Sequence, residues 1–178
     1  MADISSFAPI ADRSARVLIL GSIPGIASLQ ANQYYAHPRN GFWRIVGELI
    51  GFDAEADYPA RAQALIDAGI ALWDVVESCH RPGSLDADIA KDSVVVNDFA
   101  GFFRDHPAIR EVFFNGAAAE LAFRRHVVPK VAVEGLRLMR LPSTSPANAG
   151  LSHAQKLAAW RALELALTGG QSVLTSTS

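Results

Sequence analysis

Residues 16–25 read RVLILGSIPG, an apolar and partly β-branched run that closes on a turn rich in glycine and proline. A short apolar run bounded by turn residues predicts a buried strand over residues 16–21, followed by a loop. The same pattern predicts three further strands, over residues 70–76, 109–114 and 136–141. Apolar residues at helical spacing predict helices over residues 42–50, 58–68, 97–104, 117–127 and 152–168.

Apolar strands that alternate with helices predict the α/β class, as a three-layer α/β/α fold with a central, mainly parallel four-stranded sheet. Asn40 and Ser152 are suited to cap the helices that follow them. Residues 77–91 are expected to form a long loop. A single domain over residues 1–168 accounts for this pattern, and the small and polar residues 169–178 are expected to form a disordered tail.

The composition of the 178 residues excludes several classes of protein. One cysteine cannot form an internal disulfide framework, a four-cysteine iron–sulfur cluster or a cysteine zinc ribbon, and the five histidines show no metal-ligand spacing. No apolar run approaches the ~20 residues of a membrane span, and the N-terminus lacks the pattern of a signal peptide. We therefore expect a cytoplasmic monomer without membrane contact, iron–sulfur cluster, metal or other cofactor.

Charge is distributed unevenly behind a net charge of −2. Residues 48–105 contain 12 acidic and 4 basic side chains, whereas residues 124–140 contain five basic side chains and one acidic. A local basic stretch can hold phosphates even in a slightly acidic protein, and this one stands just before the loop expected over residues 143–150. The alternative is an ordinary solvated face.

Polar and glycine-containing segments follow each predicted strand. They are residues 21–24 (GSIP), Asp74, residues 115–116 (NG) and residues 142–145 (PSTS). Ligands of parallel α/β sheets bind outside the carboxyl ends of the strands, where these four segments meet. The sequence therefore predicts one functional site at this edge of the sheet.

Three segments carry a resemblance to a known family: residues 21–25 (GSIPG), 35–43 (YAHPRNGFW) and 141–148 (LPSTSPAN). They resemble the uracil-DNA glycosylase superfamily, and the similarity runs from about Val17 to Trp160. This resemblance implies the fold of that superfamily, DNA as the partner, and hydrolysis of the N-glycosidic bond of a nucleotide extruded from the duplex.

Two positions depart from the pattern of the uracil-directed branches. Ile23 stands where those branches carry an asparagine or aspartate, and Leu141 stands where the uracil-specific branch carries a histidine. The sequence most resembles the hypoxanthine-DNA glycosylase (deoxyinosine glycosylase) branch. The resemblance implies a monofunctional enzyme that excises hypoxanthine and leaves an abasic site in base excision repair. Strand cleavage by a lyase would need an amine, and the three lysines, Lys91, Lys130 and Lys156, are expected outside the site.

The resemblance and the chemistry of the side chains together suggest roles. Asn40 is the candidate to position the attacking water, and Asn115 is the candidate to bind the leaving base. Asp74 can accept the N1–H of hypoxanthine, whereas it repels the lone pair on N1 of adenine. The other base-binding candidates are Gly21, Ser22, Ile23, Tyr35, His37 and Phe42, the last by stacking. The DNA-binding candidates are Arg140, Ser143, Thr144, Ser145, Pro146, Ala147 and Asn148.

Structural alternatives exist for several of these residues. Asn40 is also suited to cap a helix, Asn115 to a turn before glycine, Phe42 to the core, and His37 to a structural contact. None of residues 146–148 is a large apolar wedge, which favours shallow insertion or weakly paired and single-stranded targets.

The sequence is also compatible with two other functions. One is a glycosylase for uracil, xanthine or G:T and G:U mismatches. The other is a catalytically inactive nucleic-acid-binding module, which Ile23 and Leu141 favour.

Overall fold

The computed structural model describes residues 3–83 and 85–169. In this part of the chain, four parallel strands form the central sheet in the order β3-β2-β6-β7. Their bounds are Val17–Gly21 for β2, Ile70–Asp74 for β3, Glu111–Asn115 for β6 and Arg137–Leu141 for β7. The predicted three-layer α/β fold with its four-stranded parallel sheet is confirmed.

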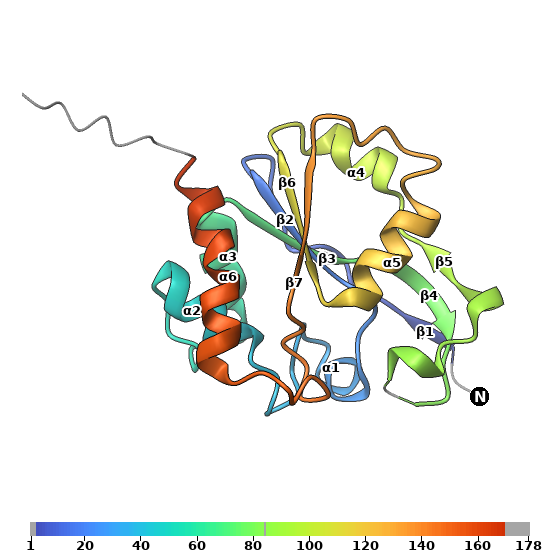
Figure 1. Cartoon of the computed structure of the whole chain (residues 1–178), viewed down its shortest axis with the longest axis horizontal. Coiled ribbons are helices and arrows are strands. Elements are labelled where there is room, and N and C mark those ends of the chain that lie inside the picture. Colours follow the sequence, from blue (N-terminus) through green and yellow to red (C-terminus); the bar gives the residue numbers. More distant parts are fainter. Residues whose placement is uncertain (1–2, 84, 170–178) are drawn as a thin grey trace, which may run out of the picture.

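Helices cover both faces of this sheet (Figure 1). One layer holds α2 (Phe42–Ile50), α3 (Tyr58–Asp67) and α6 (His153–Leu167), and the other holds α4 (Phe99–Asp105) and α5 (Ala117–His126). Strand residues point alternately into the two layers, because successive side chains of a strand face opposite sides. In β2, Val17 and Ile19 pack with the first layer, whereas Leu18 and Leu20 pack with the second. The strand is therefore buried on both faces, which explains its continuous apolar run.

Part of the segment over residues 77–91, which was expected to be a loop, belongs to a second sheet. Within the described residues, β1 (Asp3–Ser5), β4 (Val76–His80) and β5 (Val95–Val96) pair antiparallel in the order β1-β4-β5. The strand expected over 70–76 therefore ends at Asp74, and a new strand begins two residues later. Partners far away in the sequence create β4, since Ile4 of β1 packs on Cys79.

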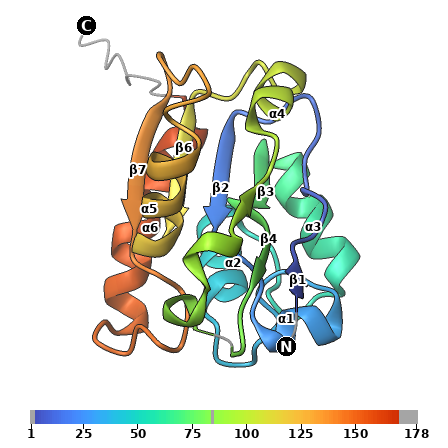
Figure 2. The ribbon, with the colours of Figure 1, turned by 90° about the vertical axis from the view of Figure 1, so that its right-hand side faces the viewer.

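Short helical segments also occur where loops were expected. Helix α1 (Ile26–Ala31) follows β2, and two 3-10 turns, η1 (Asp86–Asp88) and η2 (Lys91–Ser93), follow β4. Figure 2 shows α1 beyond the ends of β2 and β3, on the same side as the arrowhead of β7. Thus α1 lies at the edge of the sheet where the site is expected.

The expected helix caps are realised in two ways. Ser152 and Gln155 form a reciprocal capping box at the start of α6, with N–H···O distances of 3.1 and 2.8 Å. At α2 the capping position belongs to Gly41, and the Asn40 side chain accepts the N–H of Phe42 instead.

Beyond Gly169, the tail expected over residues 169–178 lies outside the described residues. None of the described helices is long and apolar enough to cross a membrane.

Candidate active site

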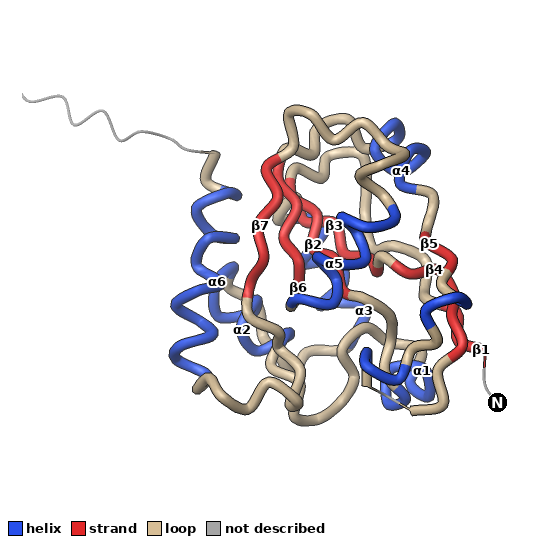
Figure 3. The backbone as a smooth tube through the Cα atoms, turned by 45° about the vertical axis from the view of Figure 1, so that its right-hand side comes forward, coloured by secondary structure: helices blue, strands red, loops and turns tan. Residues whose placement is uncertain are grey.

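A cavity of about 430 Å³ opens at the carboxyl ends of the central strands. Its walls come from the ends of β2, β3 and β6 and from the loop after β7, which lie together at one end of the molecule (Figure 3). This volume is typical of a pocket for a small molecule or a nucleobase. The cavity therefore stands where the sequence predicted a site.

Most of the predicted site residues line this cavity. They are Gly21, Ser22, Ile23, Tyr35, His37, Asn40, Asp74, Asn115, Ser143, Thr144, Ser145, Pro146 and Ala147. Phe42, Arg140 and Asn148 do not line it. Residues up to 126 positions apart in sequence are thus brought to one place by the parallel sheet.

Gly21 allows two polar side chains to meet at the end of β2. A Cβ atom at this position would lie 2.5 Å from Oδ1 of Asp74 and 2.7 Å from the hydroxyl oxygen of Tyr35. Both distances are well inside van der Waals contact, so a side chain here would displace one or both groups. Tyr35 itself has a left-handed backbone with φ of 53°, which is uncommon outside glycine and marks a constrained position.

Asp74 and Tyr35 present polar atoms that the protein does not satisfy. Oδ2 of Asp74 and the hydroxyl of Tyr35 are buried, and neither has a hydrogen bond of good geometry among the described residues, although the Asn115 amide lies close enough to the Tyr35 hydroxyl to lessen the rise in its pKa that burial causes. Burial raises the pKa of Asp74 to about 7; the nearby Asp86 carboxylate adds to this, and Arg81 opposes it. Burial and the Asp74 carboxylate raise the pKa of Tyr35 above its usual value, so the phenol keeps its proton. The cavity thus contains a buried hydrogen-bond donor next to a buried carboxyl group.

Asn115 is fixed by a reciprocal contact with Thr144. Its Nδ2 donates to the Thr144 hydroxyl at 2.9 Å, and its Oδ1 accepts the Thr144 backbone N–H at 2.9 Å. One amide hydrogen of Asn115 remains available to a ligand. Gly116, with φ of 92°, lets the next loop approach, because a Cβ there would lie 2.9 Å from Cβ of Ser143.

Asn40 serves the helix and the cavity together. Its Oδ1 accepts the backbone N–H of Phe42 at 3.0 Å, which holds the amide at the start of α2. The N–H of Gly41 donates to the carbonyl of Thr144 at 3.0 Å, so this segment is also tied to the loop after β7. An oxygen held by one donor keeps a second lone pair, which can accept a hydrogen bond from a water molecule.

His37 has a defined tautomer. Its Nδ1 accepts the backbone N–H of Arg39 at 3.0 Å, so the proton of the neutral ring is on Nε2. The ring lines the cavity and can therefore donate a hydrogen bond to a bound base from Nε2.

Phe42 lies below the cavity instead of in its wall. It is completely buried, and its ring stacks on that of Tyr35 with 4.2 Å between centroids and 29° between planes. Further edge contacts with Trp43 and Trp160 place it in the core. In this arrangement Tyr35 offers its ring to the cavity, and Phe42 supports that ring from behind.

Hydrogen bonds within the loop over residues 143–148 fix its conformation. The hydroxyl oxygens of Ser143 and Ser145 accept backbone N–H groups of Ser145 and Ala147, at 3.2 Å each. The Asn148 amide donates to the carbonyl of Ser143 at 3.0 Å, so it is turned back into the loop. Pro146 and Ala147 remain at the cavity mouth, and both serine hydroxyls can still donate to a phosphate.

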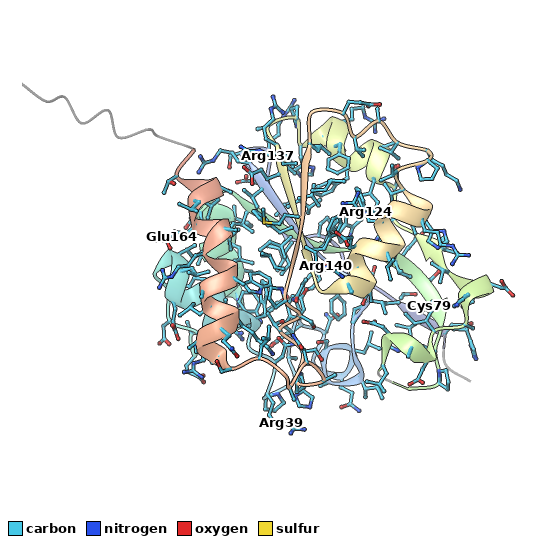
Figure 4. The ribbon with its side chains drawn as sticks, viewed as in Figure 1. Arg39, Cys79, Arg124, Arg137, Arg140 and Glu164 are labelled. Atoms are coloured by element: carbon cyan, nitrogen blue, oxygen red, sulfur yellow. The ribbon has the colours of Figure 1, made fainter. Side chains whose placement is uncertain are left out.

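The basic stretch over residues 124–140 is spread along the sheet, with Arg140 near the carboxyl end of β7 and Arg137 at its start. Helix α5 runs back from the cavity, so its last turn, with Arg124, lies toward the other end of the sheet. Figure 4 shows Arg137 far from Arg39, which projects at the cavity end. Arg124 and Arg140 pair with Glu120 at 3.6 and 3.8 Å, and Arg137 pairs with Glu111 at 3.2 Å. Arg140 is exposed on β7, and its guanidinium pairs with the same Glu120 carboxylate as Arg124.

Ten of the described lining residues were not among the predicted site residues, and four of these bring new side-chain chemistry to the cavity. Leu85 and Asp86 reach the cavity from the segment after β4, Ile26 comes from α1, and Arg39 comes from the loop before α2. The hydroxyl of Ser22 donates to Asp86 at 2.6 Å, across 64 residues of sequence. No local pattern marks the first three, whereas Arg39 lies inside the segment of residues 35–43. Among the described residues, no group of three or more His, Cys, Asp and Glu side chains is arranged to hold a metal ion.

Comparison with known proteins agrees with this geometry. The sequence profile of the Uracil DNA glycosylase superfamily matches residues 8–164. A protein of Methanosarcina acetivorans named hypoxanthine DNA glycosylase is 36% identical over 143 residues, which are 80% of this chain and 86% of the relative. Another of that name, from Methanosarcina barkeri, is 40% identical over 111 residues, 62% of this chain and 69% of the relative.

A solved structure shows the same fold. The solution NMR structure of a protein from Methanosarcina acetivorans, described as a candidate uracil DNA glycosylase, superposes with a TM-score of 0.79 at 32% identity. The match covers 94% of this chain and 99% of that one. The chain therefore belongs to the uracil DNA glycosylase superfamily and is a DNA glycosylase, a hydrolase of N-glycosidic bonds.

Proposed function

We propose that the chain is a monofunctional DNA glycosylase that excises hypoxanthine from deoxyinosine and leaves an abasic site for base excision repair. The observation that carries this proposal is the pair of unsatisfied polar atoms, Oδ2 of Asp74 and the hydroxyl of Tyr35, buried in the cavity. Buried polar groups without partners are costly, so their presence favours a ligand that completes them. The names of the two Methanosarcina relatives support the same substrate.

Hypoxanthine offers the groups that this pair needs. Its N1–H is a donor and its neighbouring O6 is an acceptor, so it can donate to Asp74 and accept from Tyr35. Adenine carries a lone pair at N1 and an amino group at C6. The Tyr35 hydroxyl can accept from that amino group, so discrimination falls on Asp74, whose ionised carboxylate accepts N1–H of hypoxanthine but repels the N1 lone pair of adenine. A buried carboxylate left without its hydrogen bond costs about 1–3 kcal/mol. Asp74 therefore distinguishes the deaminated base from its parent.

Bond cleavage builds positive charge on the sugar and negative charge on the leaving base. Nε2–H of His37 and the remaining amide hydrogen of Asn115 are the donors that offset the charge on the base. Asn40 positions the water through the lone pair of Oδ1 that Phe42 leaves open. An amide cannot act as a strong base, which suits a dissociative reaction in which the nucleophile keeps its proton until late.

The proposal is tested with labelled DNA duplexes that carry hypoxanthine, uracil, xanthine or thymine opposite each normal base. After incubation, alkali cleaves the strand wherever a base has been lost. We expect product from hypoxanthine without strand cleavage before alkali. Cleavage before alkali would contradict the monofunctional mechanism, and absence of product from hypoxanthine would contradict the substrate.

A related substrate is the second candidate. Uracil and xanthine also contain an N–H next to a carbonyl, so the Asp74 and Tyr35 pair is compatible with them. Product from uracil or xanthine in preference to hypoxanthine would favour this candidate. DNA binding without product from any duplex would instead favour an inactive binding module, as Ile23 and Leu141 suggest.

A further inference from the structure

A second cavity lies beside the first, on the other side of the segment over residues 35–40. Its volume is about 700 Å³. It shares Tyr35, His37, Arg39, Asn40 and Thr144 with the first cavity, which is called the base cavity from here on. The two cavities therefore have a common wall. Nothing in the reaction described above uses the second one.

Lys156 is an unusual constituent of this second cavity. The buried residues of α6 are Lys156, Trp160 and Leu163, which recur at helical spacing and form the stripe that faces the core. Lys156 is only 9% exposed, its side chain forms no hydrogen bond or ion pair with any described residue, and what remains accessible of it faces the second cavity. A lysine is almost never buried unless it is paired. The position thus holds a positive charge that lacks a counter-charge within the structure as described.

The remaining charges of the second cavity are also mostly positive. Arg39, Arg44 and Arg61 line it, together with a single carboxylate from Glu55 among the described lining residues. Arg44 is already paired with Glu48 at 3.5 Å, and the Arg61 guanidinium lies 4.7 Å above the ring of Trp43. Arg39 and Lys156 remain available, and Arg39 also stands at the rim of the base cavity.

We propose that the second cavity binds a backbone phosphate of the DNA strand that carries the extruded nucleotide, with Lys156 as the principal counter-charge. The proposal rests on the proposed function, since it takes the base cavity as the place of the extruded base. A nucleotide in that cavity has its phosphates at the mouth, next to Arg39 and the shared wall. A compact ammonium group is a common partner of phosphate. Binding of the phosphate supplies the counter-charge that the fold lacks.

The test measures binding, by fluorescence anisotropy at several salt concentrations, to a duplex that carries a stable abasic-site analogue. The modified nucleotide can leave the stack, and no base is released, so the result does not depend on which base the enzyme excises. Lys156→Met keeps the length of the side chain and suits the apolar stripe. We expect it to reduce the slope of log affinity against log salt concentration by about 0.9, the contribution of one phosphate contact. We also expect its melting temperature to change little, because the apolar stem of Lys156 is what packs in the stripe and its ammonium faces the cavity.

Matched variants separate charge from shape. Lys156→Arg should retain the salt slope, and Lys130→Gln, at an exposed lysine, should behave as the wild type. An unchanged slope in Lys156→Met would overturn the proposal, as would an equal loss in Lys156→Arg. In a further arm without DNA, inorganic phosphate is added and melting is followed. Stabilisation by phosphate that Lys156→Met abolishes, with an unchanged DNA slope, would identify a site for a free anion and overturn the DNA assignment.

Discussion

Asn115 and Thr144 exchange two hydrogen bonds of 2.9 Å, one in each direction, across 29 residues of sequence. The exchange joins the end of β6 to the loop that follows β7. Both segments line the base cavity, so the contact fixes the relative position of a base-binding amide and the DNA-binding loop.

Replacement of Thr144 by valine tests this contact. The variant keeps the shape of the side chain but leaves Nδ2 of Asn115 without its acceptor. We expect the free energy of unfolding to fall by about 1–2 kcal/mol, measured by urea denaturation, and the rate of base release to fall with it. Thr168→Val, at an exposed hydroxyl near the end of α6, is the control. Equal stability of the two variants would contradict a structural role for the exchange.

Asn40 is expected to act on turnover more than on binding. Asn40→Ala should lower the single-turnover rate of base release by about 100-fold, because the water loses its positioning group. DNA binding, measured by anisotropy, should change by less than about twofold. Asn40→Asp keeps an oxygen for the N–H of Phe42, so it separates the helix contact from the chemistry. Equal losses in turnover and binding would leave Asn40 with the helix contact alone.

Asp74 should make stability depend on pH in an unusual direction. Its pKa is about 7 in the folded protein and about 3.8 when unfolded, so the folded state binds more protons between these values. The free energy of unfolding should therefore fall as pH rises from about 4 to 7 and level off above that. In Asp74→Asn, the fall between pH 5 and pH 8 should be smaller by about 3 kcal/mol. Asp88→Asn, at an exposed carboxylate, should follow the wild type.

Leu85 is a large, exposed apolar side chain at the cavity, of the kind that could be inserted between bases, whereas residues 146–148 include no such side chain. It is 54% exposed and lines the mouth of the base cavity. If it helps to open the duplex, Leu85→Ala should slow release of hypoxanthine from a matched duplex by roughly tenfold and from single-stranded DNA by less than twofold, since extrusion costs a few kcal/mol only when the base is stacked and paired. Leu121→Ala, at an exposed leucine of α5, controls for loss of surface apolarity. Equal slowing on both substrates would argue against this role.

Strands β2 and β3 were predictable because they are buried along their whole length and read as continuous apolar runs. Strand β7 is the exposed edge of the sheet and carries two arginines, so its prediction depended on its alternating apolar residues and on the proline that follows it. The carboxyl ends of the strands then located the cavity, including Asp74 and Asn115, without further information. Strand β4 could not be predicted, because its burial depends on β1, which lies more than 70 residues earlier.

Other parts of the site depended on backbone direction. Tyr35 and Phe42 are both aromatic residues of one segment, and only the left-handed backbone of Tyr35 and the stacking of the two rings decide which one faces the cavity. How the basic stretch is spread in space could not be predicted for a similar reason, since α5 carries Arg124 away from the loop that follows in sequence, whereas Arg140 stays near the end of β7. Lys156 was expected outside the site, and the periodicity of α6 gives no sign of the cavity that it lines.

The absence of a side chain at Gly21 has a consequence for how this protein tolerates mutation. The space that a Cβ would fill is taken by one oxygen of Asp74 and the oxygen of Tyr35. Even alanine at position 21 would therefore displace the carboxyl group of Asp74 or the hydroxyl of Tyr35 from the cavity, although it adds only a methyl group and leaves the DNA-facing surface unchanged. A complete mutational scan scored for base release should show position 21 as intolerant to every residue. The same library scored for DNA binding should accept the smallest of them, which would provide a protein that engages DNA without processing it.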